Sequence, residues 1–130
     1  MSSVFSDNRV LDDNINIVRS DFRLIDTQIT NSNSDGIDID FSDGSIDNLS
    51  IINSDNDGID FSNSDVQGSD LFISSSSDKG ISIGENSRIS LNFFTVVCPV
   101  ATRTIVPTRQ RTRCCKNRFD SIVKITKVPL

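Results

Sequence analysis

A repeat of 22 residues constrains the fold of this chain more than any other feature. Gly36, Gly58 and Gly80 are 22 residues apart, and Asn14 stands one period before the first of them. The same period relates three further sets of positions: Thr27, Leu49 and Leu71; Ile29, Ile51 and Ile73; Asn31, Asn53 and Ser75. A repeat this short cannot bury a hydrophobic face alone, so it indicates a solenoid in which successive repeats stack.

Apolar and polar residues alternate inside each repeat, as in a strand with one buried face. In the segment that starts at Gly36, isoleucines and phenylalanine fall on one face, and Asp38 and Asp40 fall on the other. A second strand is indicated by Leu49 and Ile51, with counterparts in the next repeat. A third is marked by Leu24, Ile46, Val66 and Ile89. The pattern therefore predicts three short strands per turn of a parallel β-helix.

The fold expected from these periods is all-β: a right-handed parallel β-helix of about four ~22-residue rungs over residues 1–90. An interior ladder should contain Ile37, Ile59 and Ile81, with Asp38, Asp60 and Ser82 pointing outward from the same strands. Asn31 and Asn53 should hydrogen-bond amide to amide along the stack.

The repeat glycines are expected at corners, because glycine supplies backbone angles that other residues avoid. The third strand lies 10, 8 and 9 residues after Gly36, Gly58 and Gly80. We interpret this variation as surface loops of different length.

Composition divides the chain. Residues 1–87 hold 17 acidic and four basic residues, whereas residues 88–130 hold one acidic and nine basic residues. All six glycines precede Arg88, and all three prolines and three cysteines follow it. We expect a second region, residues 91–130, to be an irregular basic tail in which residues 91–97 can still pair as one last strand.

This tail has three possible origins. It is out-of-frame sequence on a truncated piece of a longer repeat protein, a basic capping segment, or an arm for nucleic acid or another anionic polymer. The basic cluster at residues 108–118 has no interleaved aromatic residues and adjoins an acidic region, which disfavours nucleic acid. Cys98, Cys114 and Cys115 lack the spacing of a zinc site, although a disulfide to Cys98 is possible.

The segments Asn33-Ser34-Asp35-Gly36, Asp55-Asn56-Asp57-Gly58 and Ser77-Asp78-Lys79-Gly80 resemble the right-handed parallel β-helix repeat proteins of the pectin-lyase-like superfamily. The resemblance covers about residues 12–90. It implies an extracellular or cell-surface protein that associates with polysaccharide, although this chain carries no signal peptide. It does not imply one reaction, because the superfamily includes enzymes, adhesins and repeat domains without known activity.

Polygalacturonases carry similar segments, and the resemblance implies Asp35, Asp57 and Lys79 as candidate catalytic residues. In such enzymes one carboxylic acid protonates the leaving oxygen and a carboxylate activates water. Here Asn56 and Lys79 replace an aspartate and a histidine of the family, and the downstream Arg-x-Lys motif is missing. The chain has no histidine, which also excludes Ser-His-Asp and Cys-His catalysis. We therefore expect no intact glycosidase, and interpret the Asp-Gly pairs as turn residues.

Asp13, Asp35 and Asp57 should stack at rung spacing, where like charges repel unless they are bridged or screened. Calcium is a weak candidate cofactor for these three carboxylates, because it takes oxygen ligands. The spacing matches no calcium-binding motif, so solvated aspartates are the preferred interpretation. Lys79, in the same register, is interpreted as a neutralising partner of Asp57.

The function expected is a non-catalytic repeat module that binds polysaccharide through Asp38, Asp60 and Ser82. A remnant of a carbohydrate-active enzyme (hydrolase or lyase) and a purely structural spacer are the alternatives. We also expect self-association through unpaired strand edges at the ends of the solenoid. Membrane insertion is not expected, because no run of 18 apolar residues occurs.

Overall fold

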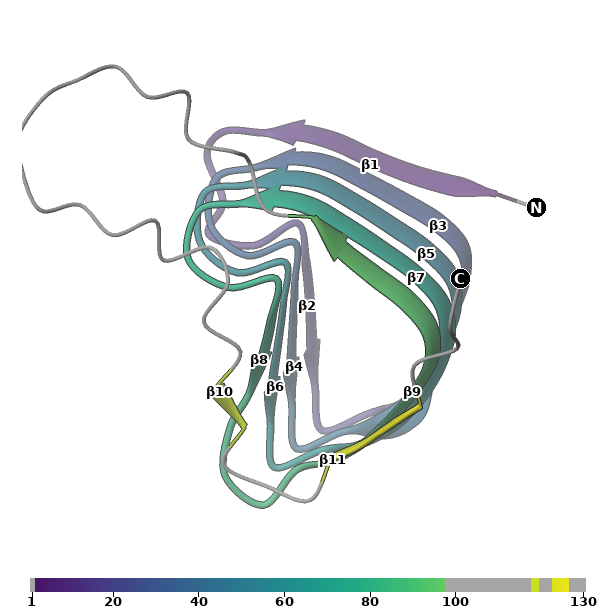
Figure 1. Cartoon of the computed structure of the whole chain (residues 1–130). Helices are drawn as coiled ribbons and strands as arrows, with labels where there is room; N and C mark the ends of the chain where they lie inside the picture. The colour runs from purple at the N-terminus through teal and green to yellow at the C-terminus, as the bar shows by residue number, and fades with distance from the viewer. Residues whose placement is uncertain (1, 98–117, 120–122, 127–130) are drawn as a thin grey trace, which may run out of the picture.

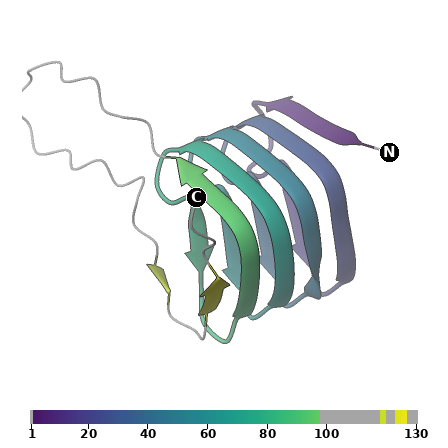
Figure 2. The ribbon, with the colours of Figure 1, turned by 45° about the vertical axis from the view of Figure 1, so that its right-hand side comes forward.

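The computed structural model describes residues 2–97, 118–119 and 123–126, and these residues form a parallel β-solenoid of about four turns. No helix occurs among them. Figure 1 shows the turns stacked one behind another, and Figure 2 shows the same stack from the side. The all-β solenoid with a spacing near 22 residues confirms the expected fold class.

Two parallel sheets form the walls of the solenoid. The larger has the order β1-β3-β5-β7-β9-β11 and the smaller β10-β8-β6-β4-β2. The larger sheet consists of β1 (Ser3–Asn8), β3 (Asp21–Ser32), β5 (Asp43–Ser54), β7 (Asp65–Ser76), β9 (Arg88–Val97) and β11 (Val123–Thr126). The smaller consists of β2 (Ile15–Val18), β4 (Ile37–Asp40), β6 (Ile59–Ser62), β8 (Ile81–Ile83) and β10 (Arg118–Phe119).

Each full rung contains one short strand and one long strand, so the prediction of three short strands is wrong. The predicted second and third strands are one continuous strand that bends at a single residue with positive φ, such as Asn48 (φ 54°) in β5. One left-handed residue turns the chain while the residues on both sides keep their ladder partners. The equivalent bends lie at Asp26, Asp70 and Phe93.

The corners depend on residues other than glycine. No glycine in the described residues has positive φ, which corrects the expected role of the repeat glycines. They are required instead for close packing: a Cβ on Gly58 would lie 2.4 Å from the backbone oxygen of Gly80. Asparagine takes several left-handed positions, as its tolerance of that conformation predicts; examples are Asn31, Asn53, Asn63 and Asn86.

Glycine also compensates for large neighbours in the long strands. Phe22 pairs with Gly44, and a Cβ on Gly44 would lie 2.6 Å from the Phe22 ring. Val66 pairs with Gly44, whereas Ile46 pairs with Gly68. The predicted third-strand series therefore mixed two positions, and its irregular spacing does not reflect loops of different length.

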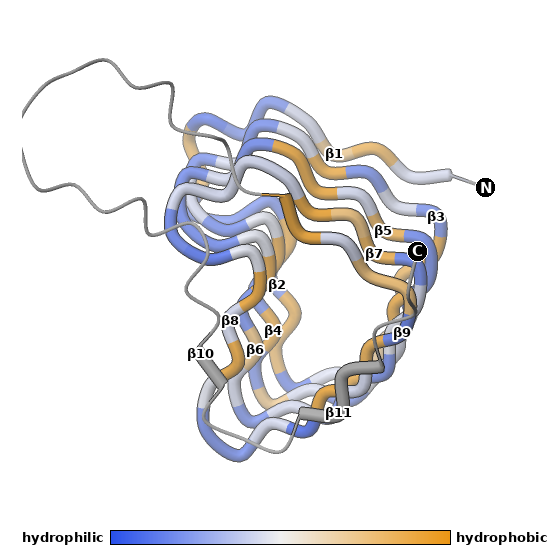
Figure 3. The backbone as a smooth tube through the Cα atoms, viewed as in Figure 1, coloured by the Kyte–Doolittle hydropathy of each residue, from blue (hydrophilic) through white to orange (hydrophobic). Residues whose placement is uncertain are grey.

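The interior is a set of aliphatic ladders. Ile37, Ile59 and Ile81 are paired in one register and are 0–3% exposed, as predicted. Apolar positions line up across neighbouring strands in Figure 3. The outward residues Asp38, Asp60 and Ser82 are only half-buried.

Polar ladders run along the corners. The Nδ2 of Asn53 donates to the Oδ1 of Asn31 at 3.0 Å, which confirms the predicted amide ladder. A serine ladder occupies another corner, where the Oγ of Ser64 accepts from the backbone N–H of Ser42 at 3.1 Å. These bonds satisfy polar groups at the places where the strands end.

Beyond the acidic repeats, the expected boundary at residue 90 falls inside β9, whose residues pair with β7 through Val97. Two short segments of the tail also pair with the solenoid: β10 with β8, and β11 with β9. Cys98, Cys114, Cys115 and most of the basic cluster lie outside the described residues.

Candidate functional site

Three stacked aspartates form a ladder that bonds to the backbone of the next rung. The Oδ1 of Asp13 accepts from the N–H of Asp35 at 3.1 Å, and the Oδ1 of Asp35 accepts from the N–H of Asp57 at 2.8 Å. Each carboxylate thus holds the turn that follows it 22 residues later. The local cause is the repeat itself, which places an aspartate before Asn14, Gly36 and Gly58.

Lys79 ends this ladder. Its backbone N–H and its Nζ both donate to the Oδ1 of Asp57 at 2.9 Å, and Nζ lies 2.8 Å from Oδ2. Asp57 is 2% exposed, so this ion pair is largely removed from water. Burial acts to lower the pKa of Lys79, but the bonds to Asp57 and Asp78 outweigh it and raise the pKa. The interpretation of Lys79 as a neutralising partner is confirmed.

The candidate catalytic residues are therefore occupied with structural bonds. Asp35 is 8% exposed and also accepts from the Nδ2 of Asn56 at 2.7 Å. Burial raises the pKa of Asp35, and its hydrogen bonds from Asp57 and Asn56 act in the opposite direction. A general acid and base must reach a substrate. These carboxylates reach neighbouring turns of their own chain.

The outward face of the smaller sheet carries Asp38, Asp60 and Ser82 side by side on β4, β6 and β8. Asp38 accepts from the Nδ2 of Asn16 at 3.3 Å. Burial raises the pKa of Asp38 to about 6, and the charges of Asp40 and other nearby aspartates raise it further. Burial also raises the pKa of Asp60, against a hydrogen bond from Ser82.

Metal binding has no preformed centre in the part of the chain that the structure describes. No group of three or more histidine, cysteine, aspartate or glutamate side chains is placed there to hold an ion. In the calcium candidates Asp13, Asp35 and Asp57, at least one oxygen of each carboxylate already accepts a backbone N–H.

A second aspartate ladder was not recognised in the sequence. Asp21, Asp43 and Asp65 pair in register at the start of β3, β5 and β7, and Arg88 occupies the same position in β9. The Nη1 of Arg88 lies 3.0 Å from the Oδ2 of Asp65. The 22-residue period gives the three aspartates, but the step to Arg88 is 23 residues. Both ladders therefore end in a cation at the same end of the solenoid.

A groove on the outer face of the larger sheet is the most open polar site. It has a volume of about 280 Å³ and crosses β3, β5, β7 and β9. Two side-chain ladders form its walls, with Ile46 and Gly68 between them: Arg23, Ser45, Gln67 and Ser90 on one side, and Asp47, Ser69 and Asn92 on the other. We call it the ladder groove.

The ladder groove offers free hydrogen-bonding groups. Ser69 donates to Asp47 at 2.8 Å. Among the described residues, Ser45, Gln67 and Asn92 have no side-chain hydrogen bond. Sequence reasoning missed this groove because its residue types differ from rung to rung, and only their outward position in the long strands relates them.

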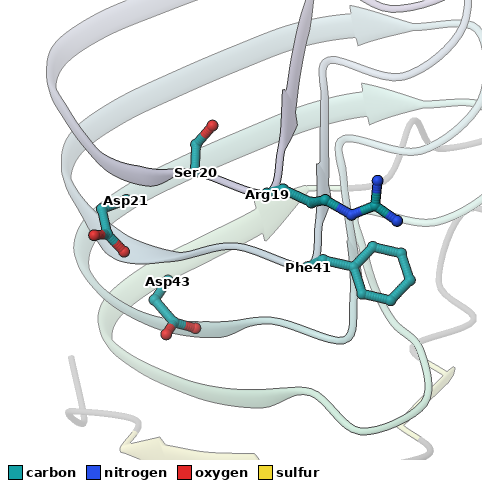
Figure 4. A pocket seen from close by; sticks show the side chains of 5 residues that line it. All are labelled: Arg19, Ser20, Asp21, Phe41 and Asp43. Atoms are coloured by element: carbon teal, nitrogen blue, oxygen red, sulfur yellow. The ribbon is translucent and has the colours of Figure 1, made fainter.

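A smaller hollow lies at a corner, with a volume of about 250 Å³. Its lining residues are Arg19, Ser20, Asp21, Phe41 and Asp43 (Figure 4). The guanidinium of Arg19 stacks 5.5 Å from the centre of the Phe41 ring, so one face of the ring is already covered.

Comparison with protein-family models, with curated proteins and with solved structures finds no match. Within the described residues, no helix is long and apolar enough to cross a membrane. Function must therefore be inferred from the surfaces of the solenoid.

Proposed function

We propose that this chain is a non-catalytic solenoid module that binds a polysaccharide in the ladder groove. The observation that carries the proposal is the free polar groups of Ser45, Gln67 and Asn92, which stand on three successive rungs. Strands in a sheet are about 4.8 Å apart, so the groove presents hydrogen-bonding groups at regular intervals along a line. A linear polymer rich in hydroxyl groups can use such a line repeatedly.

Charge favours a neutral glycan over an anionic one. Residues 1–87 carry 17 acidic and four basic residues, so a uronate polymer would be repelled over the whole rod. The groove itself contains one acidic and one basic residue, Asp47 and Arg23, among neutral polar side chains. This composition suits hydroxyl groups, which both donate and accept.

The proposal includes a relationship to the pectin-lyase-like superfamily and an extracellular or cell-surface location. Support comes from the Asp-Gly segments of the repeat together with the parallel solenoid fold. A module that binds without turnover also agrees with the structural use of Asp35, Asp57 and Lys79.

The test is binding of the chain to immobilised neutral and uronate polysaccharides. Gln67→Ala should weaken binding to the neutral polymer roughly fivefold, the equivalent of about one hydrogen bond. Gln28→Ala is the matched control, because Gln28 is also exposed but lies on β3 beyond the bend. Equal binding by both variants would remove the ladder groove from consideration.

The acidic face is the second candidate surface for the same function. Asp38→Asn with Asp60→Asn separates the two surfaces: loss of binding in this double variant, with Gln67→Ala unaffected, would assign the glycan to β4 and β6. Release of reducing or unsaturated ends would instead indicate an enzyme remnant. Absence of both binding and turnover would leave a structural spacer.

A further inference from the structure

The N-terminal end of the solenoid exposes unpaired strand edges. In the smaller sheet, β2 pairs only with β4 among the described strands. In the larger sheet, β1 covers β3 only from Thr27 to Ser32. The first half of β3 therefore has a partner only on its β5 side.

Burial shows what this open end lacks. The inward residues Ile15, Ile17, Phe22 and Leu24 are only partly buried. In the next rung, the partners Ile37 and Ile39 of the two isoleucines are 0% exposed, and Ile46, the partner of Leu24, is 1% exposed. The first rung has the same apolar ladder but no neighbour on one side of it.

The backbone of β2 is also unpaired on that side. The N–H groups of Ile15 and Arg19 donate to the next rung, to the carbonyls of Gly36 and Asp40 at 3.3 and 3.0 Å. Alternate residues of a strand direct their N–H groups to opposite sides. The N–H groups of Asn16 and Val18 therefore face the open end.

The opposite end of the solenoid is different. There β10 pairs with β8, and β11 pairs with β9, so both sheets continue past the last full rung. A second copy would find the matching open edge on its own N-terminal end.

Charge selects the same end. Between residues 27 and 78 the chain has 11 acidic residues and no basic one, so the middle rungs of two copies repel each other. Residues 9–26 hold Arg9, Arg19 and Arg23 against four aspartates. This near-neutral rung, with both signs present, is suited to a self-complementary contact.

We infer that two copies of this chain associate N-terminal end to N-terminal end. In this two-fold arrangement the β2 edges meet antiparallel, the unpaired N–H groups find carbonyls, and the apolar ladder continues from one copy into the other. Two-fold contacts of this kind close on themselves and stop at a dimer. The inference is independent of glycan binding.

The experiment is sedimentation equilibrium of the full chain in reductant, over a wide concentration range. The mass should rise from 14.3 kDa toward twice that value and go no higher. Val18→Pro should weaken the dimer at least about tenfold, because proline removes the outward N–H from an edge strand that tolerates it. Val18→Thr keeps that N–H and a β-branched side chain, so its dissociation constant should stay within about twofold of the parent chain.

Three results would overturn the inference: a monomer at every concentration, growth beyond two copies, or equal dissociation constants for Val18→Pro and Val18→Thr. Circular dichroism establishes that each variant folds. If Val18→Pro does not fold, Leu24→Lys replaces it, because a lysine at the half-exposed open end can extend to solvent in the monomer. Two such lysines would face each other in the dimer, and an unchanged dissociation constant would then count against the contact.

Discussion

Asp57 binds Lys79 through both the main chain and the side chain. One carboxylate oxygen accepts from the backbone N–H and from Nζ, and the other lies 2.8 Å from Nζ. The pair fixes the turn of one rung on the next and supplies a cation at the end of a ladder of stacked aspartates. Five predictions follow from this arrangement and from the rest of the solenoid.

Removing the Asp57 carboxylate should strongly destabilise the fold. Asp57→Ala leaves the buried backbone N–H of Lys79 without its acceptor and removes the ion pair, so we expect a loss of about 3 kcal/mol in unfolding free energy. Denaturant titration measures it. Asp55→Ala, at an exposed neighbouring position, is the control and should change stability by less than about 0.5 kcal/mol.

Ser54→Ala should be neutral or stabilising. The Ser54 hydroxyl is buried and has no hydrogen-bond partner among the described residues, so its removal relieves a desolvation cost of about 1 kcal/mol. Ser32→Ala is the matched comparison and should destabilise, because the Ser32 Oγ accepts from the Nδ2 of Asn14 at 2.6 Å. Thermal melts of the two variants should move in different directions; a large loss in Ser54→Ala would show that its hydroxyl is bonded.

Gly58→Ala should prevent stable packing of the rungs. The new Cβ would lie 2.4 Å from the backbone oxygen of Gly80 and 2.5 Å from the Cγ2 of Ile73, and the backbone cannot yield cheaply. We expect a loss of more than about 2 kcal/mol by denaturant titration. Gly84→Ala, whose nearest neighbour is the Ser62 hydroxyl at 2.9 Å, should cost much less.

Stability should fall as pH rises from about 4 to about 6. The folded pKa of Asp38 is about 6, above its ordinary value of 3.8, because burial and neighbouring aspartates disfavour the charged form. In this window the folded state binds more protons than the unfolded state, so raising the pH destabilises it. Melts across pH 4–7 should show the slope, and Asp38→Asn should reduce it. An unchanged slope in Asp38→Asn would assign the effect to Asp35 or Asp60, whose pKa values are also raised.

Calcium should stabilise the chain no more than sodium does at equal ionic strength. The ladder carboxylates Asp13, Asp35 and Asp57 already accept backbone N–H groups, and salt can screen the remaining repulsion. The measurement is a melt in NaCl and in CaCl2 at matched ionic strength. A rise specific to calcium that disappears in Asp57→Asn would make the ladder a metal site.

The candidate sites could be predicted only in part. The sequence places Asp35, Asp57 and Lys79 in one register, and the structure joins them by hydrogen bonds. It does not reveal that these carboxylates bond to the backbone, because that depends on how the turns of adjacent rungs approach. The ladder groove lies outside the repeat signal, since Ser45, Gln67 and Ser90 are related by position and not by residue type.

By itself the sequence determined the stacking of rungs and the identity of the interior ladder, because a period of 22 combined with alternation leaves one face to bury. Ile37, Ile59 and Ile81 illustrate this directly. Tertiary structure alone decided where the chain bends and why glycine recurs. A bend needs only one left-handed residue, which Asn48, Asp70 or Phe93 can supply, so no residue type marks it. Gly58 is required by the Gly80 carbonyl of the next rung, a contact between residues 22 apart that exists only after the rungs have stacked.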